Sequence, residues 1–322
     1  MLFTSFTRIA AVLSAAAAFT ASAPAAAQYP DRAVRLVVPF AAGGGVDALA
    51  RPFAKELSEV LGQSVVVENK ASVTGQIGAT DVARAKPDGY AILLSSAAFA
   101  TTPAFYPEVP YDPVKDFSPI TIVAAASQVM VANKDFKANS VADLIAMAKA
   151  GDPINFALSG GTGIQALATE MLASSAKVEF TNVPYKGAGG AFIDLISGQV
   201  NVMIDNPASS LPHVRSGKLK LLATTGAQRM AILPDTPAVA ETLPGFEARN
   251  WFILAAPAGT PDAVVQKLNR AAREVLARDS MKQFFQRDGL DVMANSPAEA
   301  SAFLAAEQAK WARVVKDNNL KP

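Results

Sequence analysis

The sequence contains no cysteine and a single histidine, His213, among its 322 residues. The absence of cysteine excludes a disulfide framework, a thiolate metal site and a lipid-carrying N-terminal cysteine. One histidine leaves carboxylates as the only plentiful metal ligands, and there is no calcium-binding loop of the D-x-D-x-D-G type. We therefore expect neither a metal ion nor a cofactor.

Long hydrophobic runs are also absent. The apolar stretch from Ile9 to Phe19 follows Arg8 and is shorter than the roughly 18 to 20 residues that span a bilayer. Small residues ending in Ala25-Ala26-Ala27 follow it, which is the pattern of a cleaved signal peptide. We expect residues 1–27 to be removed, with cleavage after Ala27, during export to the periplasm.

Neither sign of charge is in excess. Arg8 is the only charged residue within 1–27, so the remaining 295 residues carry 28 basic and 28 acidic side chains. A net charge near zero argues against nucleic acid or an anionic membrane surface as the partner. A chain of this length buries a large core, and at roughly 100 to 200 residues per domain it suggests two domains.

Strand-like and helix-like patterns alternate along the chain, which indicates an α/β fold. Continuous apolar runs of strand length predict buried parallel strands. The longer run Ile120 to Val131 is interpreted as a crossing between two α/β units, and Arg249 to Ala256 as a strand that returns to the first unit. The other predicted strands are Ala33–Phe40, Ser64–Asn69, Tyr90–Ser95, Ile154–Leu158, Val178–Val183, Val200–Ile204 and Leu219–Thr224.

Several helix boundaries carry recognisable signals. Ser140 with Asp143 predicts the capped start of one helix. Ser296 with Glu299 predicts the start of another. Pro52 lies within a helical periodicity, so that helix is expected either to kink or to begin late. Five prolines between residues 103 and 119 are expected to break regular structure.

Three glycine-rich turns stand where a strand-like run is followed by a helix-like pattern. A helix start leaves several backbone N–H groups unpaired and carries the positive end of the helix dipole, so such turns would hold a carboxylate without an arginine. A side chain at Gly44 or Gly163 is expected to block the ligand or to strain a turn of positive φ. The turns are Ala41-Ala42-Gly43-Gly44-Gly45, Ser159-Gly160-Gly161-Thr162-Gly163 and Lys186-Gly187-Ala188-Gly189-Gly190.

Two enzymatic interpretations remain open. Residues 43–48 match the dinucleotide fingerprint G-x-G-x-x-A, although the export signal and the residues between strand and glycines disfavour a nucleotide. Ser159, Asp205 and His213 follow the chain order of a secreted α/β serine hydrolase. The separation of Asp205 from His213 is short for a triad, and the alternative is a histidine that is exposed or partly packed.

Three charged residues near the turns each have two interpretations. Asp47 falls in the first turn of its helix, where a carboxylate either satisfies free N–H groups or contacts the ligand. Asp205 also precedes a helix, and a ligand hydroxyl or amine would suit its carboxylate. Lys186 is either a solvated side chain or a charge at the mouth of the site.

Seven motifs spread over the chain occur together in the order typical of one family. They are V-R-L-V-V-P-F-A-A-G-G-G-V-D-A-L-A-R (34–51), V-V-V-E-N (65–69), P-D-G-Y (87–90), Y-D-P-V-K-D-F (111–117), V-P-Y-K-G-A-G-G-A (183–191), A-P-A-G-T-P (256–261) and E-Q-A-K-W (307–311). The sequence resembles the Bug family of extracytoplasmic solute receptors, the binding component of tripartite tricarboxylate transporters. The match covers essentially all of the chain after residue 27.

The resemblance implies a two-domain periplasmic-binding-protein fold, type II-like and closing as a Venus flytrap, with strands that cross between the domains. Residues 28–126 and 250–322 would form the first domain, and residues 127–249 the second. It implies a non-enzymatic, monomeric receptor that binds a small carboxylate-bearing organic acid between the domains and delivers it to integral membrane subunits. A periplasmic sensor or adaptor of the same fold is an alternative.

The resemblance also places ligand contacts on specific residues. The first domain would contribute Phe40, Ala41, Ala42, Gly43, Gly44, Gly45 and Asp47. The second domain would contribute Ser159, Gly160, Gly161, Thr162, Gly163, Lys186, Gly187, Ala188 and Asp205. One departure is Ala166, where members of the family often carry histidine, so the identity of the acid does not follow from relatives.

Overall fold

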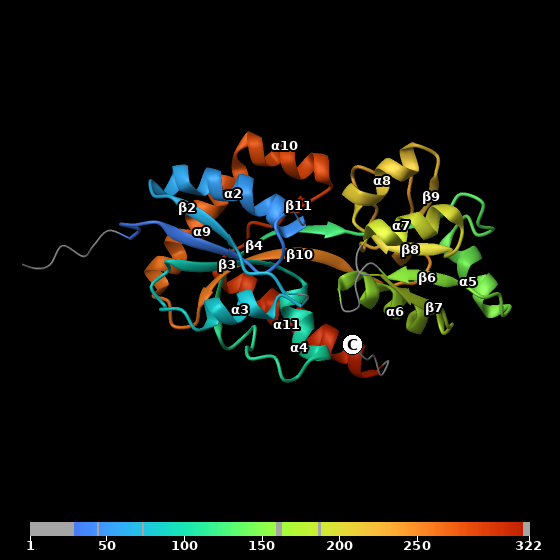
Figure 1. Cartoon of the computed structure of the whole chain (residues 1–322), viewed down its shortest axis with the longest axis horizontal. Helices are drawn as coiled ribbons and strands as arrows, with labels where there is room; N and C mark the ends of the chain where they lie inside the picture. Colours follow the sequence, from blue (N-terminus) through green and yellow to red (C-terminus); the bar gives the residue numbers. More distant parts are fainter. Residues whose placement is uncertain (1–28, 44, 73, 159–162, 186–187, 318–322) are drawn as a thin grey trace, which may run out of the picture.

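The computed structural model describes residues 29–43, 45–72, 74–158, 163–185 and 188–317. Two β-sheets, each covered by helices, form two lobes that lie side by side (Figure 1). The predicted signal segment 1–27 lies outside the described residues. Strands and helices alternate along both lobes, as the α/β prediction requires.

The first lobe is built on a mixed six-stranded sheet. β1 pairs in parallel with β2 and β3, whereas β10 runs antiparallel to both β3 and β4. Leu36 and Val37 of β1 belong to hydrophobic clusters on opposite faces, so this strand is buried on both sides. The order across the sheet is β11 (Asp291–Val292), β4 (Phe117–Ser127), β10 (Arg249–Pro257), β3 (Ala91–Ser96), β1 (Val34–Val38) and β2 (Val65–Asn69).

Helices cover both faces of this sheet (Figure 1). Phe53, Leu268 and Phe285 join one set of helices to one face, and Phe99 and Leu304 join the other set to the opposite face. The first set is α2 (Gly45–Leu61), α9 (Asp262–Ala277) and α10 (Asp279–Asp288). The second set is α3 (Gln76–Ala83), α4 (Ala98–Phe105) and α11 (Pro297–Asp317).

The second lobe is built on a five-stranded sheet. β6 is parallel to β7 and β8, and β5 is antiparallel to β8 and β9. The order is β7 (Thr181–Pro184), β6 (Asn155–Leu158), β8 (Val202–Asp205), β5 (Val129–Asn133) and β9 (Leu219–Thr224). Its helices are α5 (Val141–Lys149), α6 (Ile164–Ala176), α7 (Ala188–Ser197), α8 (Pro207–Arg215) and the 3-10 turn η1 (Val239–Glu241).

Two backbone crossings connect the lobes. β4 ends at Ser127 and β5 begins at Val129, so the single long run expected at Ile120 to Val131 is broken at Gln128. The chain returns through Ala248 into β10. Thr225 ties the crossings together: its hydroxyl donates to the Ala248 carbonyl at 2.6 Å and accepts from the Gln128 N–H at 2.8 Å.

One of the two alternatives for Pro52 is wrong, and so is the break expected at Pro103. α2 begins at Gly45, well before Pro52, and not late, so the kinked alternative stays a prediction. The carbonyl that Pro52 cannot bond belongs to Ala48, which is exposed and open to water. Pro103 lies inside α4, where a break was expected, because the hydroxyl of Tyr111 donates at 3.1 Å to the carbonyl of Phe99 that the proline leaves unpaired.

Both predicted helix caps are confirmed. Ser140 accepts a hydrogen bond from the N–H of Asp143 at 3.0 Å. Ser296 and Glu299 form the reciprocal box, in which the Ser296 N–H donates to the Glu299 carboxylate at 2.8 Å and the Glu299 N–H donates to the Ser296 hydroxyl at 3.3 Å. These caps satisfy helix-start N–H groups, which is why the short sequence signal is reliable.

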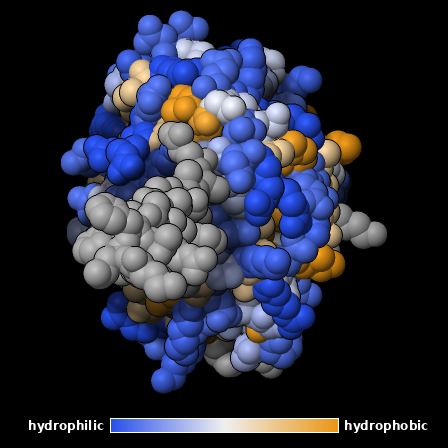
Figure 2. Space-filling view, turned by 90° about the vertical axis from the view of Figure 1, so that its left-hand side faces the viewer, coloured by the Kyte–Doolittle hydropathy of each residue, from blue (hydrophilic) through white to orange (hydrophobic). Residues whose placement is uncertain are grey.

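Tyr29 anchors the start of the described chain to the first lobe. Its hydroxyl donates to the Gly89 carbonyl at 2.8 Å, and its ring meets the Tyr90 ring edge-on with centroids 5.1 Å apart. Lys267 donates to the Tyr29 carbonyl. The described surface at this end is mostly hydrophilic, with hydrophobic residues in small separate groups (Figure 2). None of the described helices is long and apolar enough to cross a bilayer.

Candidate functional site

The carboxyl ends of the parallel strands in one lobe face those in the other. β4 runs into the second lobe at Gln128, and β1 and β3 point the same way. In the second lobe β5 runs away from this crossing, so β6 and β8 point back toward it. The strand order changes direction between β1 and β3 and between β6 and β8. Ligands of α/β sheets bind at such switch points, and here two of them oppose each other.

The turn after β1 is held in shape by Asp47. Gly43 has a φ of +80°, which favours glycine, and its N–H donates to the Asp47 carboxylate at 2.8 Å. Asp47 is 2% exposed and also accepts from Arg51 at 2.8 Å and from Asn69 at 2.9 Å. Phe40 is half-buried, Ala41, Ala42 and Gly43 are exposed, and Gly45 begins α2. Gly44 lies outside the described residues.

The pKa of Asp47 lies below its usual range. Burial works to raise this pKa, but the hydrogen bonds from Arg51, the Gly43 N–H and Asn69 favour the charged form and outweigh burial. The carboxylate is therefore ionised at neutral pH and fixes the glycine turn against α2 and β2. Asp47 therefore stabilises the turn by accepting hydrogen bonds from neighbouring groups of the protein.

Asp47→Asn is expected to lower the free energy of unfolding by about 1.5 to 3 kcal/mol at pH 7, because an acceptor of charge-assisted hydrogen bonds is lost. A lowered pKa stabilises the fold above the unfolded-state value and is lost as the pH falls through the folded-state value. The gap between variant and wild type should therefore shrink below about pH 4. Urea unfolding at several pH values measures it. Asp262→Asn, an exposed acid in the first turn of α9, is the control. A gap independent of pH would contradict the argument.

The first turn also rests on α3. Gly78 has no room for a side chain, since an added Cβ would lie 2.7 Å from Pro39 Cα and 3.1 Å from the Lys70 carbonyl. Gly75 caps α3 with a φ of +74° and packs beneath the ring of Phe40. These contacts fix the direction in which Phe40 and the following residues leave β1.

The second glycine turn is described only at its last residue. Ser159, Gly160, Gly161 and Thr162 lie outside the described residues. Gly163 forms the N-cap of α6 with φ −77° and ψ 173°, an extended conformation open to any residue. The expectation of positive φ at Gly163 is therefore wrong, whereas the expectation that a side chain there blocks the ligand stays a prediction.

The third glycine turn and the end of β8 lie in the same lobe. Lys186 and Gly187 are outside the described residues, and Ala188 begins α7. Next to them, Tyr185 donates its hydroxyl to Asp194 at 2.7 Å, and burial together with this carboxylate raises the pKa of Tyr185 to about 12. Asp205 ends β8, is 2% exposed, and accepts from the hydroxyl of Ser209.

The turn after β3, which lies at the switch point beside β1, was not predicted from the sequence. Ser95 and Ser96 end the strand, and α4 begins two residues later at Ala98. The Ala97 N–H donates to the side chain of Asn250 at 3.4 Å. In the sequence, the signal for this turn was a predicted strand that ends in small residues. Because no helix was predicted directly after that strand, the signal was too weak to identify the turn as part of the site.

A second contact that the sequence did not predict ties the crossing to α6 of the second lobe. Gln128, fully buried in the crossing, accepts a hydrogen bond at 3.4 Å from the side chain of Gln165. Gln165 lies in the first turn of α6, two residues after Gly163. Neither glutamine belongs to a local motif, so only the fold brings them together.

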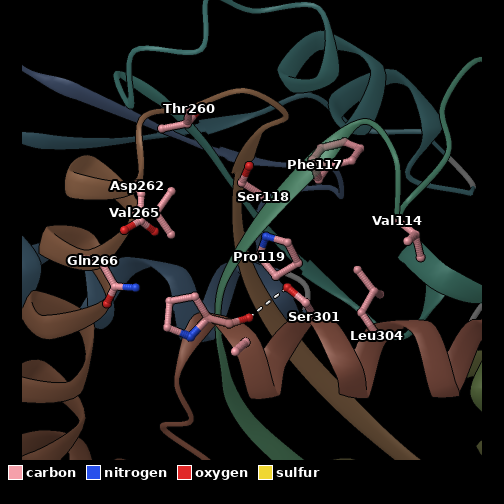
Figure 3. A pocket seen from close by; sticks show the side chains of 12 residues that line it. Val114, Phe117, Ser118, Pro119, Thr260, Asp262, Val265, Gln266, Ser301 and Leu304 are labelled. Carbon is pink, nitrogen blue, oxygen red and sulfur yellow. Dashed lines mark hydrogen bonds between the residues drawn. The ribbon is translucent and has the colours of Figure 1, made fainter.

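A pocket of about 390 Å³ lies elsewhere, at the far end of β4 between α9 and α11 (Figure 3). Asp262 and Gln266 line one side of it, and Ser301 lines the other and donates to the Pro297 carbonyl at 2.8 Å. Among the described residues that line this pocket there is no lysine or arginine. Because its one charged group is an acid, the pocket does not suit a carboxylate.

The described residues do not assemble a catalytic or metal centre. His213 lies in the last turn of α8, with its ring 4.6 Å from that of Phe192, which matches the packed alternative. Asp205 lies before the first turn of the same helix, and Ser159 is outside the described residues. Within the described ranges there is no group of three or more histidine, cysteine, aspartate or glutamate residues that could hold a metal ion.

Comparison with known proteins identifies the class of molecule. The model of the tripartite tricarboxylate transporter family receptor matches residues 49–320. The solved structure of the periplasmic binding protein BugD is 37% identical, with a TM-score of 0.78, covering 91% of this chain and 99% of that one. Rpa4515 of R. palustris with adipate is 36% identical, with a TM-score of 0.81 and the same coverage of 91% and 99%.

A third structure extends the comparison. MatC from Rhodopseudomonas palustris with bound malate is 31% identical, with a TM-score of 0.77, covering 89% of this chain and all of that one. The two-domain periplasmic-binding-protein fold is therefore confirmed. All three neighbours are solute-binding proteins, and this chain is likewise a receptor and not an enzyme. A serine hydrolase does not fit this class of protein.

Proposed function

We propose that this chain, which belongs to the tripartite tricarboxylate transporter receptor family, binds a small organic acid by its carboxylate between the two lobes in the periplasm. The acid would then be delivered to integral membrane subunits of the transporter. The segments proposed to contact it are Phe40–Gly45, Ser159–Gly163, Lys186–Ala188 and Asp205, together with the turn after β3. Asp47 would act by holding the first turn.

The observation that carries the proposal is the opposition of the two switch points. The turns that follow β1 and β3 in one lobe, and β6 and β8 in the other, each lead into the N-terminus of a helix. Helix N-termini offer unpaired N–H groups and a positive dipole end, both suited to a carboxylate. A ligand bound by both lobes would favour their closure, which excludes water and strengthens charge-assisted hydrogen bonds.

The charges near the first turn support binding by backbone groups. Arg51 is the cation beside this turn within the described residues, and it is paired with Asp47 and Asn69. Lys70, on the adjoining loop, is paired with Asp81 at 2.6 Å. Because these cations are engaged with protein acids and amides, the proposal gives the first glycine turn backbone N–H groups as its anion donors.

MatC holds malate and Rpa4515 holds adipate, so these two acids begin the panel of candidate ligands, while Ala166 leaves the identity of the acid to the binding experiment. Delivery to a transporter rests on the family alone. Uptake of the labelled acid by cells with and without this protein separates delivery from a sensor role, since a sensor would leave uptake unchanged.

Thermal unfolding of the protein without residues 1–27 tests the binding proposal. Malate, adipate, succinate and citrate form the panel, and adipamide, which has no carboxylate, is the control. A ligand at 100 times its dissociation constant stabilises the fold by about 2.7 kcal/mol, so the best acid should raise the Tm by a few degrees. Calorimetry should then give one site per chain. If none of the acids shifts the Tm and calorimetry detects no binding, the proposal is wrong.

A further inference from the structure

The two lobes share hydrophobic core along one side of the molecule. Ala300 and Leu304, near the start of α11, pack in a cluster of the first lobe with Phe99. Trp311 and Val315, further along the same helix, belong to the main cluster of the second lobe. α11 therefore reaches from one lobe to the other, which agrees with its course in Figure 1. Shared core of this kind restricts how the lobes can rotate.

A polar group reinforces this link midway along α11. One oxygen of the Glu307 carboxylate accepts from the indole N–H of Trp251 on β10 and from that of Trp311, each at 2.8 Å. Lys310 lies 3.5 Å from the other oxygen, donates to the Glu247 carbonyl at 2.8 Å, and lies over the Trp311 ring. The side chain of Glu307 is 14% exposed. We call these five residues the Glu307 clasp.

The Glu307 clasp joins both lobes to the returning crossing. Trp251 belongs to the first-lobe cluster and Trp311 to the second, and Glu307 holds both by their N–H groups. Glu247 lies where the chain leaves the second lobe, between the buried residues Phe246 and Ala248. Helix α11 and the returning crossing therefore meet at the Glu307 clasp.

The clasp is not tightly filled. A cavity of about 50 Å³ lies among Glu247, Trp251, Glu307 and Lys310 and is also lined by Arg249. The Nε of Arg249 is buried and has no hydrogen-bond partner among the described residues, although its guanidinium pairs with Asp291. Room for water and an unpaired donor let the polar contacts adjust by small shifts while the hydrophobic ends of α11 stay packed.

We propose that the Glu307 clasp is the pivot about which the lobes close, and that Glu307 is a positioning residue for ligand binding. This inference rests on the proposed receptor function. Among the described residues, Glu307 contacts Trp251, Trp311 and Lys310, so it would act by holding the lobes in the arrangement from which they can close. Apparent affinity falls in proportion when the competent fraction falls.

Glu307→Gln tests the pivot, because the amide is similar in size but loses the charge that holds two N–H groups and Lys310. Calorimetry and stopped-flow binding use the best acid of the panel. We expect the dissociation constant to rise three- to tenfold through a slower association rate, with an unchanged dissociation rate. Glu274→Gln, an exposed change on α9 (63% exposed), should bind as wild type. A Glu307→Gln protein that is less heat-stable but binds as wild type would overturn the proposal.

Two further measurements cover the remaining outcomes. Lys310→Met keeps the aliphatic stem over Trp311 and loses the bond to Glu247, so it should raise the dissociation constant two- to threefold even if Glu307→Gln does not fold.

If the wild type binds no acid, the receptor proposal fails separately. Small-angle scattering of the unliganded proteins then decides the pivot: Glu307→Gln should show a broader distribution of lobe separations, and an identical profile would refute it.

Discussion

Gly163→Val weakens carboxylate binding about tenfold or more in our expectation, while the unliganded protein remains folded. Gly163 caps α6 in an extended conformation that valine adopts freely, so no backbone strain opposes the change. An added Cβ lies 2.9 Å from the end of the flexible Gln165 side chain, which can move aside. We expect the valine methyl groups to occupy the approach to the N–H groups at the start of α6. Losing one charge-assisted hydrogen bond costs about 1.5 to 3 kcal/mol, and calorimetry measures it.

Two further variants separate the possible causes of such a loss. Gly163→Ala adds one carbon and should weaken binding less than valine. Gln165→Ala removes the side chain that the valine would displace and should stay within about threefold of wild type. Undiminished affinity in a folded Gly163→Val protein would show that the second glycine turn does not hold the carboxylate.

Trp311→Ala should cost about 3 to 5 kcal/mol of unfolding free energy, the range for truncating a large buried aromatic residue. Trp311 is fully buried in the second-lobe cluster, although it belongs to a helix that starts on the first lobe. Its loss opens a cavity and leaves Glu307 with one indole donor. Urea unfolding by circular dichroism measures the change.

Trp311→Phe is the matched variant, because it keeps an aromatic ring and loses the N–H. We expect it to cost less than half of the alanine effect. A loss below about 1 kcal/mol for Trp311→Ala would mean that α11 contributes little to the second lobe, contrary to the shared core.

Local signals in the sequence predicted the parts of the fold that local physics determines. β9 spans the predicted range Leu219–Thr224, and the Ser140 and Ser296 caps form as expected. Pro103 shows where this reasoning stops. A proline inside a short pattern indicates a break, yet the hydroxyl of Tyr111 supplies the missing donor from outside the helix. No local rule contains that contact.

In the candidate site, too, local features could be predicted from the sequence, whereas contacts between distant segments could not. The turn after β1 could be predicted, since a glycine-rich turn and an early Asp47 are both local features. The turn after β3 could not, because its N–H group meets Asn250, which is distant along the chain. The Gln128 and Gln165 contact likewise depends on the crossing between the lobes. Contacts between residues far apart along the chain are the ones that a sequence pattern is least able to reveal.

The anchoring of Tyr29 has a practical consequence for using this protein as a detector of organic acids. Its bonds to Gly89 and Lys267 hold the chain start on the first lobe alone, at the end far from the second lobe (Figure 1). α11, in contrast, ends at Asp317 after packing on the second lobe. A surface linker or dye attached before Tyr29 leaves the movement between the lobes unrestricted. One attached after α11 restrains the helix that packs on both lobes. Immobilised sensors should therefore be tethered through the N-terminus.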